Sequence, residues 1–246
     1  MKRFILTLTA IFICTIARSD EITINWMNTD KTIDHTTTCT IGGDVNVPIP
    51  TKYGYTFNGW RANYTPIEYL ESTGTQYIDT GFYPNRNTSI KIKMQLNYSS
   101  NGPYGFGTEH KYEFFVWSSI ITFVYSSEYK GNKISTDDIL EVDWNKNRIK
   151  YYINGVFQEQ ITALYSDFHI SYPLYLFALN RGTSVPEFAG GVKIYYTKLY
   201  DNDVLVRDFV PVLDLAGTPC MYDRVEGKFY YNAGTGDFIA GPVIGE

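Results

Sequence analysis

The stretch GVKIYYTKLYDNDVLVRDFVPVLDLAGTPCMYDRVEGKFYYNAGTGD, residues 191–237, decides the fold of this chain. Apolar and polar residues alternate from Val192 to Thr197, and a period of two is typical of a strand with one buried face. Residues that favour turns separate four such runs, at 191–200, 204–213, 218–224 and 228–231. Consecutive antiparallel strands must cover their apolar face with a second sheet, so the stretch predicts part of a two-sheet sandwich.

More strands are predicted upstream by the same alternation. Residues 89–96 place Ile90, Ile92 and Met94 on one face and lysines between them. The dipeptide Asn154-Gly155 between two apolar runs is typical of a tight hairpin, because both turn residues must accept positive φ. Pro211 indicates an edge strand or a bulge. No stretch has helical periodicity, so the class is all-β; the further strands expected are 112–117, 120–125, 139–144, 148–153 and 174–179.

A family resemblance rests on this stretch together with residues 67–81, IEYLESTGTQYIDTG. The two segments resemble the laminin-G-like, concanavalin-like jelly-roll modules of bacterial secreted and surface proteins, and the likeness extends over residues 66–242. It implies an antiparallel two-sheet jelly roll over residues 65–246. Because this sandwich hosts binding modules and some glycoside hydrolases, the resemblance implies a fold more narrowly than a function.

The amino terminus is typical of a secretory signal peptide. A basic start, Met1-Lys2-Arg3, precedes an apolar run over residues 4–16, and Ala17-Arg18-Ser19 has small residues where a signal peptidase cuts. A membrane-spanning helix needs roughly 20 apolar residues, and this run is shorter. We therefore expect cleavage after Ser19 and a secreted or cell-envelope protein, either extracellular or periplasmic.

Residues 20–64 are expected to form a small separate unit. Alternation predicts strands at residues 22–26 and 36–41. Residues 54–60, GYTFNGW, then resemble the end of the Listeria-Bacteroides repeat of internalin-type surface proteins. That resemblance implies a β-grasp-like unit, present here in one copy, with Phe57 and Trp60 in a small core.

Net charge limits the classes of partner, and the cysteine content bears on whether the chain forms a disulfide. Loss of residues 1–19 leaves 18 basic against 26 acidic side chains, a net charge of −8. Nucleic acid binding requires a clustered basic surface, and none is visible. After cleavage the chain keeps Cys39 and Cys220, which lie in different predicted units; two isolated thiols are favoured over a disulfide, although export permits one.

A catalytic pattern is suggested by Glu141-Val142-Asp143-Trp144-Asn145. Retaining glycosidases of this sandwich class place carboxylates on alternate residues of one strand, about 5 to 5.5 Å apart. The pattern of that hydrolase family has a further glutamate just beyond, where this chain has Asn145-Lys146-Asn147. We therefore favour a structural strand, with Val142 and Trp144 inward and two solvated acids outward, and assign no catalytic residue.

Metal and cofactor motifs are weak. His35, His110 and His169 are scattered, and no paired histidines or cysteines have the spacing of a transition-metal site. Some laminin-G-like modules carry Ca²⁺, and Asp79, Asn85 and Asp138 could contribute oxygens to such a site, although their spacing does not specify one. No cofactor is assigned, and Ca²⁺ is left open.

Aromatic content favours carbohydrate recognition. The chain has 4 Trp, 22 Tyr and 15 Phe, more than a sandwich core of this size requires. Sugar rings stack on exposed aromatic rings, and their hydroxyls bond to Asn, Asp and Arg. The tyrosines in or beside turn-rich segments are expected to be partly exposed: Tyr98, Tyr104, Tyr125, Tyr129, Tyr165 and Tyr172.

The candidate ligand site is placed on loops, which carry function on rigid scaffolds. Tyr104 lies in a glycine-rich segment, and Asn180 and Arg181 follow the predicted strand 174–179. The candidate set is Tyr104, His110, Trp117, Tyr125, Asn180 and Arg181. The sequence predicts an exported non-catalytic recognition module that binds a glycan or a surface protein and inserts no segment into a membrane. A glycoside hydrolase and a structural envelope component are the alternatives.

Overall fold

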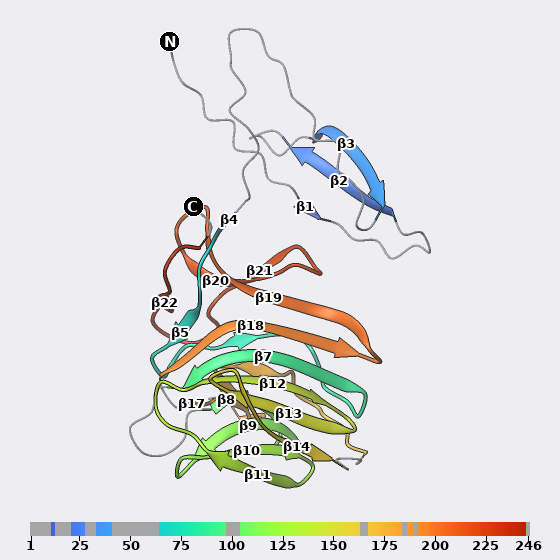
Figure 1. The fold of residues 1–246 in the computed structure, drawn as a ribbon. Helices are drawn as coiled ribbons and strands as arrows, with labels where there is room; N and C mark the ends of the chain where they lie inside the picture. The colour runs from blue at the N-terminus through green and yellow to red at the C-terminus, as the bar shows by residue number, and fades with distance from the viewer. Residues whose placement is uncertain are drawn as a thin grey trace.

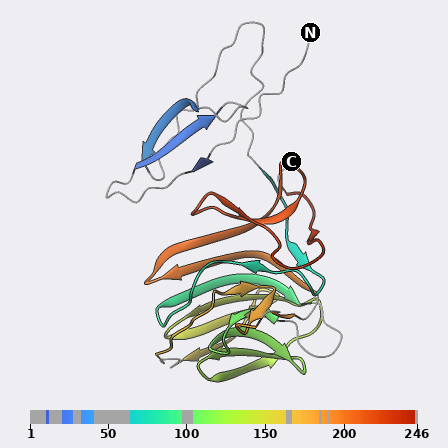
Figure 2. The same cartoon turned by 180° about the vertical axis from the view of Figure 1, so that it is seen from behind.

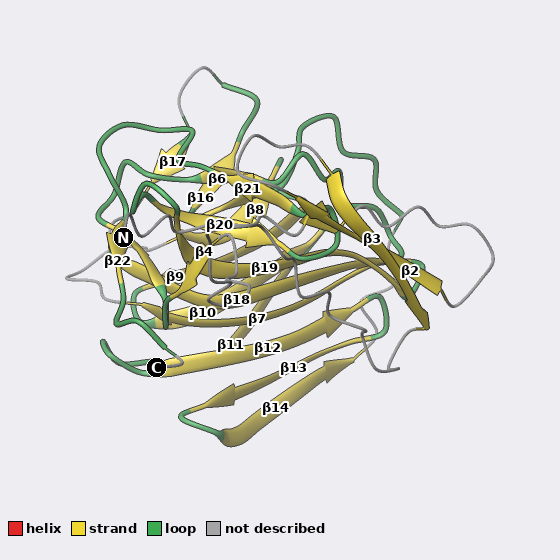
Figure 3. Cartoon of the chain, turned by 90° about the horizontal axis from the view of Figure 1, so that it is seen from above, coloured by secondary structure: helices red, strands yellow, loops and turns green. Residues whose placement is uncertain are grey.

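A computed structural model describes residues 11–12, 21–27, 33–40, 64–96, 104–162, 167–183, 186–188 and 191–244. Every regular element in these ranges is a strand, as Figure 3 shows by colour. Several predictions lie outside them: most of the signal peptide, the repeat-like residues 54–60, Tyr98 and Tyr165.

The amino-terminal strands form a small antiparallel sheet. Its order is β1 (Ile11–Phe12), β2 (Glu21–Met27), β3 (Ile33–Thr40). The hairpin of β2 and β3 runs in register from the pair Glu21 and Thr40 to the pair Met27 and Ile33, with a shift beside Trp26. Cleavage after Ser19 would remove β1 and leave this hairpin.

Residues 64–244 form two packed sheets (Figures 1 and 2). The larger sheet has 11 described strands, and its main path is β14-β13-β12-β7-β18-β19-β20-β21. Off this path, β5 pairs with β18, β4 pairs with β19, and β22 pairs with β5. The bounds are β4 (Tyr64–Pro66), β5 (Leu70–Ser72), β7 (Thr88–Leu96), β12 (Ile139–Asn145), β13 (Arg148–Ile153), β14 (Val156–Thr162), β18 (Val192–Asp201), β19 (Val204–Asp214), β20 (Pro219–Asp223), β21 (Lys228–Tyr230) and β22 (Ile239–Ala240).

The smaller sheet has 8 described strands, with the main path β11-β10-β9-β8-β15-β6. All its pairs are antiparallel except that of β16 with β8, and β17 pairs with β16. The bounds are β6 (Ile78–Asp79), β8 (Tyr104–Thr108), β9 (Tyr112–Trp117), β10 (Ile120–Tyr125), β11 (Glu128–Lys133), β15 (Tyr175–Leu176), β16 (Ala178–Asn180) and β17 (Glu187–Phe188). The chain is thus an all-β sandwich, as predicted.

Aromatic side chains fill the space between the sheets. Trp144 of the large sheet is fully buried and stacks on Tyr112 of the small sheet, with ring centroids 4.3 Å apart and planes inclined by 15°. Phe106 and Phe123 contact the same indole. The alternating residues of β7, Ile90 to Leu96, are also buried. Burial of such large rings supplies most of the driving force for packing the two sheets.

Turn chemistry agrees with the predicted hairpin. Asn154 and Gly155 have φ of 51° and 75°, as a two-residue turn between β13 and β14 requires. The expected strand 174–179 is divided into β15 and β16, because Phe177 between them has φ of 68°.

Pro211 indicates an edge strand or a bulge in the sequence, and of these the edge position is wrong. β19 lies inside its sheet between β18 and β20. On one side, β19 pairs with β18 up to Phe209 and with β4 from Val212 onward. Pro211 lies at the point where the neighbour of β19 changes from β18 to β4. No backbone N–H is needed there, and the Pro211 carbonyl accepts from the Ile67 amide at 3.1 Å.

Candidate functional site

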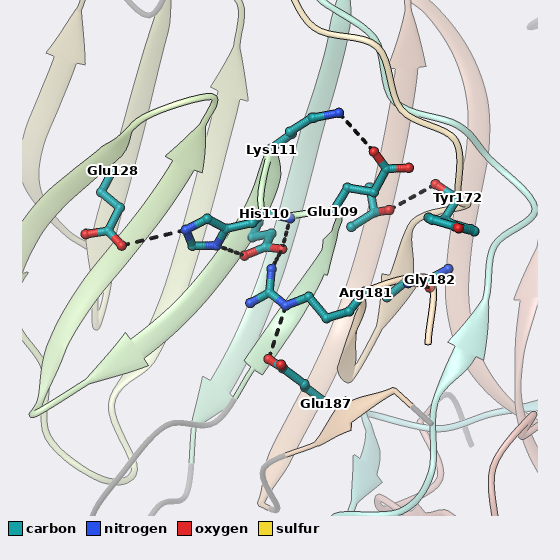
Figure 4. A network of polar contacts seen from close by, with 11 residues as sticks. Glu109, His110, Lys111, Glu128, Tyr172, Arg181, Gly182 and Glu187 are labelled. Carbon is teal, nitrogen blue, oxygen red and sulfur yellow. Dashed lines mark hydrogen bonds and ion pairs between the residues drawn. The ribbon is translucent and has the colours of Figure 1, made fainter. Parts of the chain in front are cut away.

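An open cleft of about 550 Å³ lies beside the turn between β8 and β9 (Figure 4). Three segments line it. The turn contributes Glu109 and His110, the segment before β15 contributes Ser171 and Tyr172, and the residue after β16 is Arg181. All three segments are fixed at one or both ends by sheet pairing, so the cleft has a rigid support.

The turn between β8 and β9 projects its side chains from the end of a hairpin. Glu109 and His110 both have φ of 54°, while Thr108 and Tyr112 beside them are paired across the strands. Two successive positive φ angles make a turn that matches the twist of the strands. Neither residue is Asn or Gly, so the conformation is costly and depends on contacts made by the side chains.

Glu113, in β9, lies beneath the cleft and has no exposed surface. Its cross-strand partner is Gly107. A Cβ atom on Gly107 would lie 2.6 Å from Cγ of Glu113 and 2.6 Å from Cδ2 of Leu179. The glycine therefore creates the space in which the glutamate side chain lies.

The carboxylate of Glu113 organises the polar groups around it. It pairs with Nη1 of Arg181 through Oε1 and accepts from the His110 amide, and Nδ1 of His110 lies 3.1 Å from Oε2. Burial raises the pKa of the Glu113 carboxyl, and the Arg181 and His110 charges oppose the rise. Arg181 also donates from Nε to Glu187 at 3.2 Å. Two carboxylates thus fix the plane of the guanidinium and offset its charge.

Glu109 joins the turn to the segment before β15. Its carboxylate accepts from Nζ of Lys111 at 3.0 Å and from the Ser171 amide. Lys111 also donates to the His169 carbonyl at 2.7 Å. Burial acts to raise the pKa of Glu109, but the hydrogen bonds from Lys111 and Ser171 outweigh it and leave the pKa below its ordinary value.

Tyr172 presents an aromatic ring at the cleft. The ring lies across Gly182, which has φ of 69°; a Cβ atom there would be 2.1 Å from the ring. The backbone carbonyl of Tyr172 accepts from the Thr108 hydroxyl at 2.9 Å. The residue remains 42 % exposed. One side of the ring is therefore supported by backbone while part of it stays open to solvent.

Comparison with known proteins finds solved structures that share the fold. A candidate carbohydrate-binding protein from Bacteroides ovatus ATCC 8483 matches with a TM-score of 0.53 and 11 % sequence identity, over 94 % of this chain and 71 % of that chain. The likeness shows a shared sandwich fold. No family model matches the chain. No curated protein sequence matches it either.

Of the residues predicted for the site, His110 and Arg181 come together around Glu113. Asn180 is 5 % exposed, and its side chain forms hydrogen bonds with the backbone. Nδ2 donates to the Pro173 carbonyl, and Oδ1 accepts from the Gly182 amide, both at 3.0 Å. It therefore holds the loop that carries its neighbour Arg181.

Two predicted residues lie away from the cleft. Tyr125 was expected at the surface, but it is 1 % exposed and packs in the core against Phe168. That prediction is wrong, because the alternation of β10 directs this ring between the sheets. Trp117 is 52 % exposed at the far end of β9. Trp117 lies four positions beyond Glu113 along the extended strand, or about 13 Å away. Tyr104 begins β8, and its side chain lies outside the described residues.

Sequence reasoning missed Glu109, Glu113 and Ser171, and it expected Tyr172 to be exposed without assigning it to the site. The alternation of β9 places Glu113 on the outer face, where a glutamate is ordinarily solvated. Its burial depends on Arg181, 68 residues later in the chain. No local pattern could have found that contact.

The carboxylates of β12 are ion-paired. Val142 and Trp144 face inward, as predicted, and Glu141 and Asp143 face outward. Nζ of Lys93 lies 3.4 Å from Glu141, and Nζ of Lys91 lies 3.8 Å from Asp143. Lysines on the neighbouring strand β7 thus form ion pairs with both carboxylates.

The oxygens considered for Ca²⁺ form turn contacts. Asp79 accepts from the Gly81 amide at 2.9 Å, Asn85 from the Asn87 amide at 2.8 Å, and Asp138 from the Ser135 amide at 2.8 Å. Within residues 64–244, as far as they are described, no three His, Cys, Asp or Glu side chains gather as metal ligands would.

Cys220 is a buried free thiol, the favoured alternative to a disulfide. Among the described elements no helix has the length and apolar character needed to cross a bilayer.

Proposed function

We propose that this chain is an exported, non-catalytic module that binds a glycan in the Tyr172 cleft. The observation that carries the proposal is the supported, partly exposed ring of Tyr172 beside fixed polar side chains. A flat aromatic surface next to oriented donors and acceptors suits a sugar, which has an apolar ring face and a rim of hydroxyls.

The polar groups are suited to hydroxyls. Arg181 uses one Nη1 contact for Glu113 and its Nε for Glu187, which leaves further guanidinium N–H groups for a ligand. The His110 ring is more than half exposed at the side-chain level. Because these groups are held by protein contacts before a ligand arrives, binding costs less conformational entropy.

Local charge favours a neutral glycan. Three carboxylates, Glu109, Glu113 and Glu187, surround two cations, Lys111 and Arg181. An acidic sugar would bring a further negative charge to a site whose cations are already paired. Neutral hexoses are therefore the preferred class, and a surface protein is the alternative partner that the experiment below distinguishes.

Export and non-catalysis rest on different observations. Export is supported by the basic start, the apolar run and the small residues before Asp20. Mass spectrometry of secreted material should find Asp20 at the amino terminus, and an intact Met1 would contradict this. Non-catalysis is supported by the lysines that pair with Glu141 and Asp143.

The deciding experiment is a glycan array followed by calorimetry with the best glycan. Tyr172→Ala should weaken affinity at least about fivefold, because removing a central aromatic contact costs more than about 1 kcal/mol. Trp117→Ala is the matched control, since it removes a similarly exposed ring from the far end of β9. Equal affinity in wild type and Tyr172→Ala would reject this cleft. An array with no bound glycan would favour a protein partner instead.

A further inference from the structure

A second hollow lies on the side of the large sheet, away from Glu113. It has two adjoining parts of about 230 Å³ and 170 Å³. Both parts are lined by Ser89, Asn145 and Asp203. One part adds Lys91, Asp143, Arg148 and Tyr200, and the other adds Asn87, Lys146, Asn147 and Asn202. Polar side chains thus form the whole of its described lining.

Three loops at the ends of adjacent strands build this hollow. β12, β7 and β18 are neighbours in the sheet, and Asp201 of β18 pairs with Thr88 of β7. In the turn after β12, Oδ1 of Asn145 accepts from the Asn147 and Arg148 amides at 3.0 and 3.2 Å. Turn hydrogen bonds of this kind keep the loop in one conformation without a ligand.

Several groups at the hollow have no partner among the described residues. The hydroxyls of Ser89 and Tyr200 and the carboxylate of Asp203 make no hydrogen bond or ion pair with a described residue. Nε of Arg148 is buried and makes no hydrogen bond either. Donors and acceptors that converge on one hollow and are unused by the protein are available to a ligand.

We propose that this hollow binds a single sugar unit. Its two adjoining parts, of about 230 and 170 Å³, together lie near the lower end of the roughly 300–1,000 Å³ typical of ligand pockets, which suits a small ligand. Cations and anions are mixed, with Nζ of Lys91 3.8 Å from Asp143, which favours a neutral ligand with many hydroxyls. The ring of Tyr200 is partly buried beside these groups and offers an apolar face.

The position of the second hollow relates it to the Tyr172 cleft. Residues 167–172 cross one end of the sandwich between them. Asp167 pairs with Arg86 at 3.8 Å, one residue from Asn87, and the His169 carbonyl accepts from Lys111, one residue from His110. The two sites therefore share an end of the molecule, and the ligand class of the second site rests on the proposed function of the first.

The experiment is an NMR titration of the full chain, labelled with ¹⁵N, using glucose, galactose, mannose and N-acetylglucosamine. At least one sugar should change the chemical shifts of the backbone amide resonances of residues 87–89, 145–148 and 200–203. The variants Ser89→Ala and Tyr200→Phe each remove one hydroxyl and should weaken this binding about three- to tenfold. Tyr152→Phe, on the neighbouring strand β13, is the control and should leave it unchanged.

The outcomes separate the two sites. Shifts near Tyr172 without shifts at residues 87–89, 145–148 and 200–203 would overturn the second site and leave the proposed function standing. Shifts at the second site that persist in Tyr172→Ala and vanish in the double variant of Ser89 and Tyr200 support two independent sites. Shifts at the second site that are undiminished in that double variant would overturn the assignment, and absence of shifts in both regions would overturn both proposals.

Discussion

Glu113 and Asp223 are both buried carboxylates beside an arginine, and the partner of Glu113, Arg181, also lines the cleft that holds Tyr172. Burial raises the pKa of each. Oδ1 of Asp223 accepts from the Asp208 and Val225 amides, and Nε of Arg207 lies 3.6 Å from Oδ2. Arg207 also pairs with Glu226 at 2.7 Å. Around Glu113 the partner Arg181 also lines an open cleft. The open cleft that Arg181 lines, more than the buried ion pair itself, indicates a binding site.

The largest expected effect follows from removing each arginine. Arg181→Ala would leave Glu113 buried without its main counter-charge, and breaking such a pair costs about 3 kcal/mol, the low end of the range, because the carboxyl can take up a proton. Arg207→Ala should cost about half as much, since Nε of Arg207 lies 3.6 Å from Asp223 without a hydrogen bond, whereas Arg181 donates a hydrogen bond to Glu113. Urea denaturation of both variants measures the difference. A larger loss for Arg207→Ala would contradict it.

Two glycines test whether the Tyr172 ring must lie where it does. Both Gly182 and Gly155 have positive φ, so alanine costs about 1 to 2 kcal/mol at either position. At Gly182 the new Cβ would also displace the Tyr172 ring, whereas at Gly155 nothing lies within 4 Å. Gly182→Ala should therefore weaken glycan affinity severalfold and Gly155→Ala should not. Equal affinity of both variants, measured by calorimetry, would show that the ring position is irrelevant.

The sandwich was predictable because its determinants are local. Alternation located β9, β10 and β13 with the bounds that the structure has, and Asn154-Gly155 located a turn. The edge inferred from Pro211 failed for a non-local reason. A proline breaks a ladder only where a partner needs its N–H, and here β18 gives way to β4 at that point.

The cleft was only partly predictable. His110 and Arg181 were expected near each other because loops at strand ends gather on a sandwich. Tyr125 was misplaced, since a tyrosine before a turn looks exposed until the register of β10 is known. Glu113 could not be found, because its burial needs the space over Gly107 and the guanidinium of Arg181. Such features depend on tertiary contacts, not on the local pattern of residues.

A smaller effect concerns pH. Burial raises the pKa of Asp223 above its ordinary value of 3.8. The folded state then binds this proton more tightly than the unfolded state, so its contribution to stability is present at low pH and is lost as pH rises through the folded pKa. Wild type should lose stability relative to Asp223→Asn as pH rises above the ordinary pKa of 3.8. Urea denaturation at a series of pH values tests it, and a rising difference would contradict the direction.

The smallest effect is expected for Glu141→Gln. Its ion pair with Lys93 is 3.4 Å long and both side chains are about one third exposed or more, so solvent screens it and its loss should change stability by less than about 1 kcal/mol. The substitution removes one of the two acids that a hydrolase of this sandwich class would use. If the chain is non-catalytic, wild type and Glu141→Gln should both release no reducing ends from the glycan found by the array.

The companion variant Glu113→Gln separates burial from charge, because it changes the same functional group where no solvent reaches it. It should alter glycan affinity through Arg181, while Glu141→Gln should not. Reducing ends released by wild type and lost in Glu141→Gln would make the outer face of β12, and not the Tyr172 cleft, the site of function.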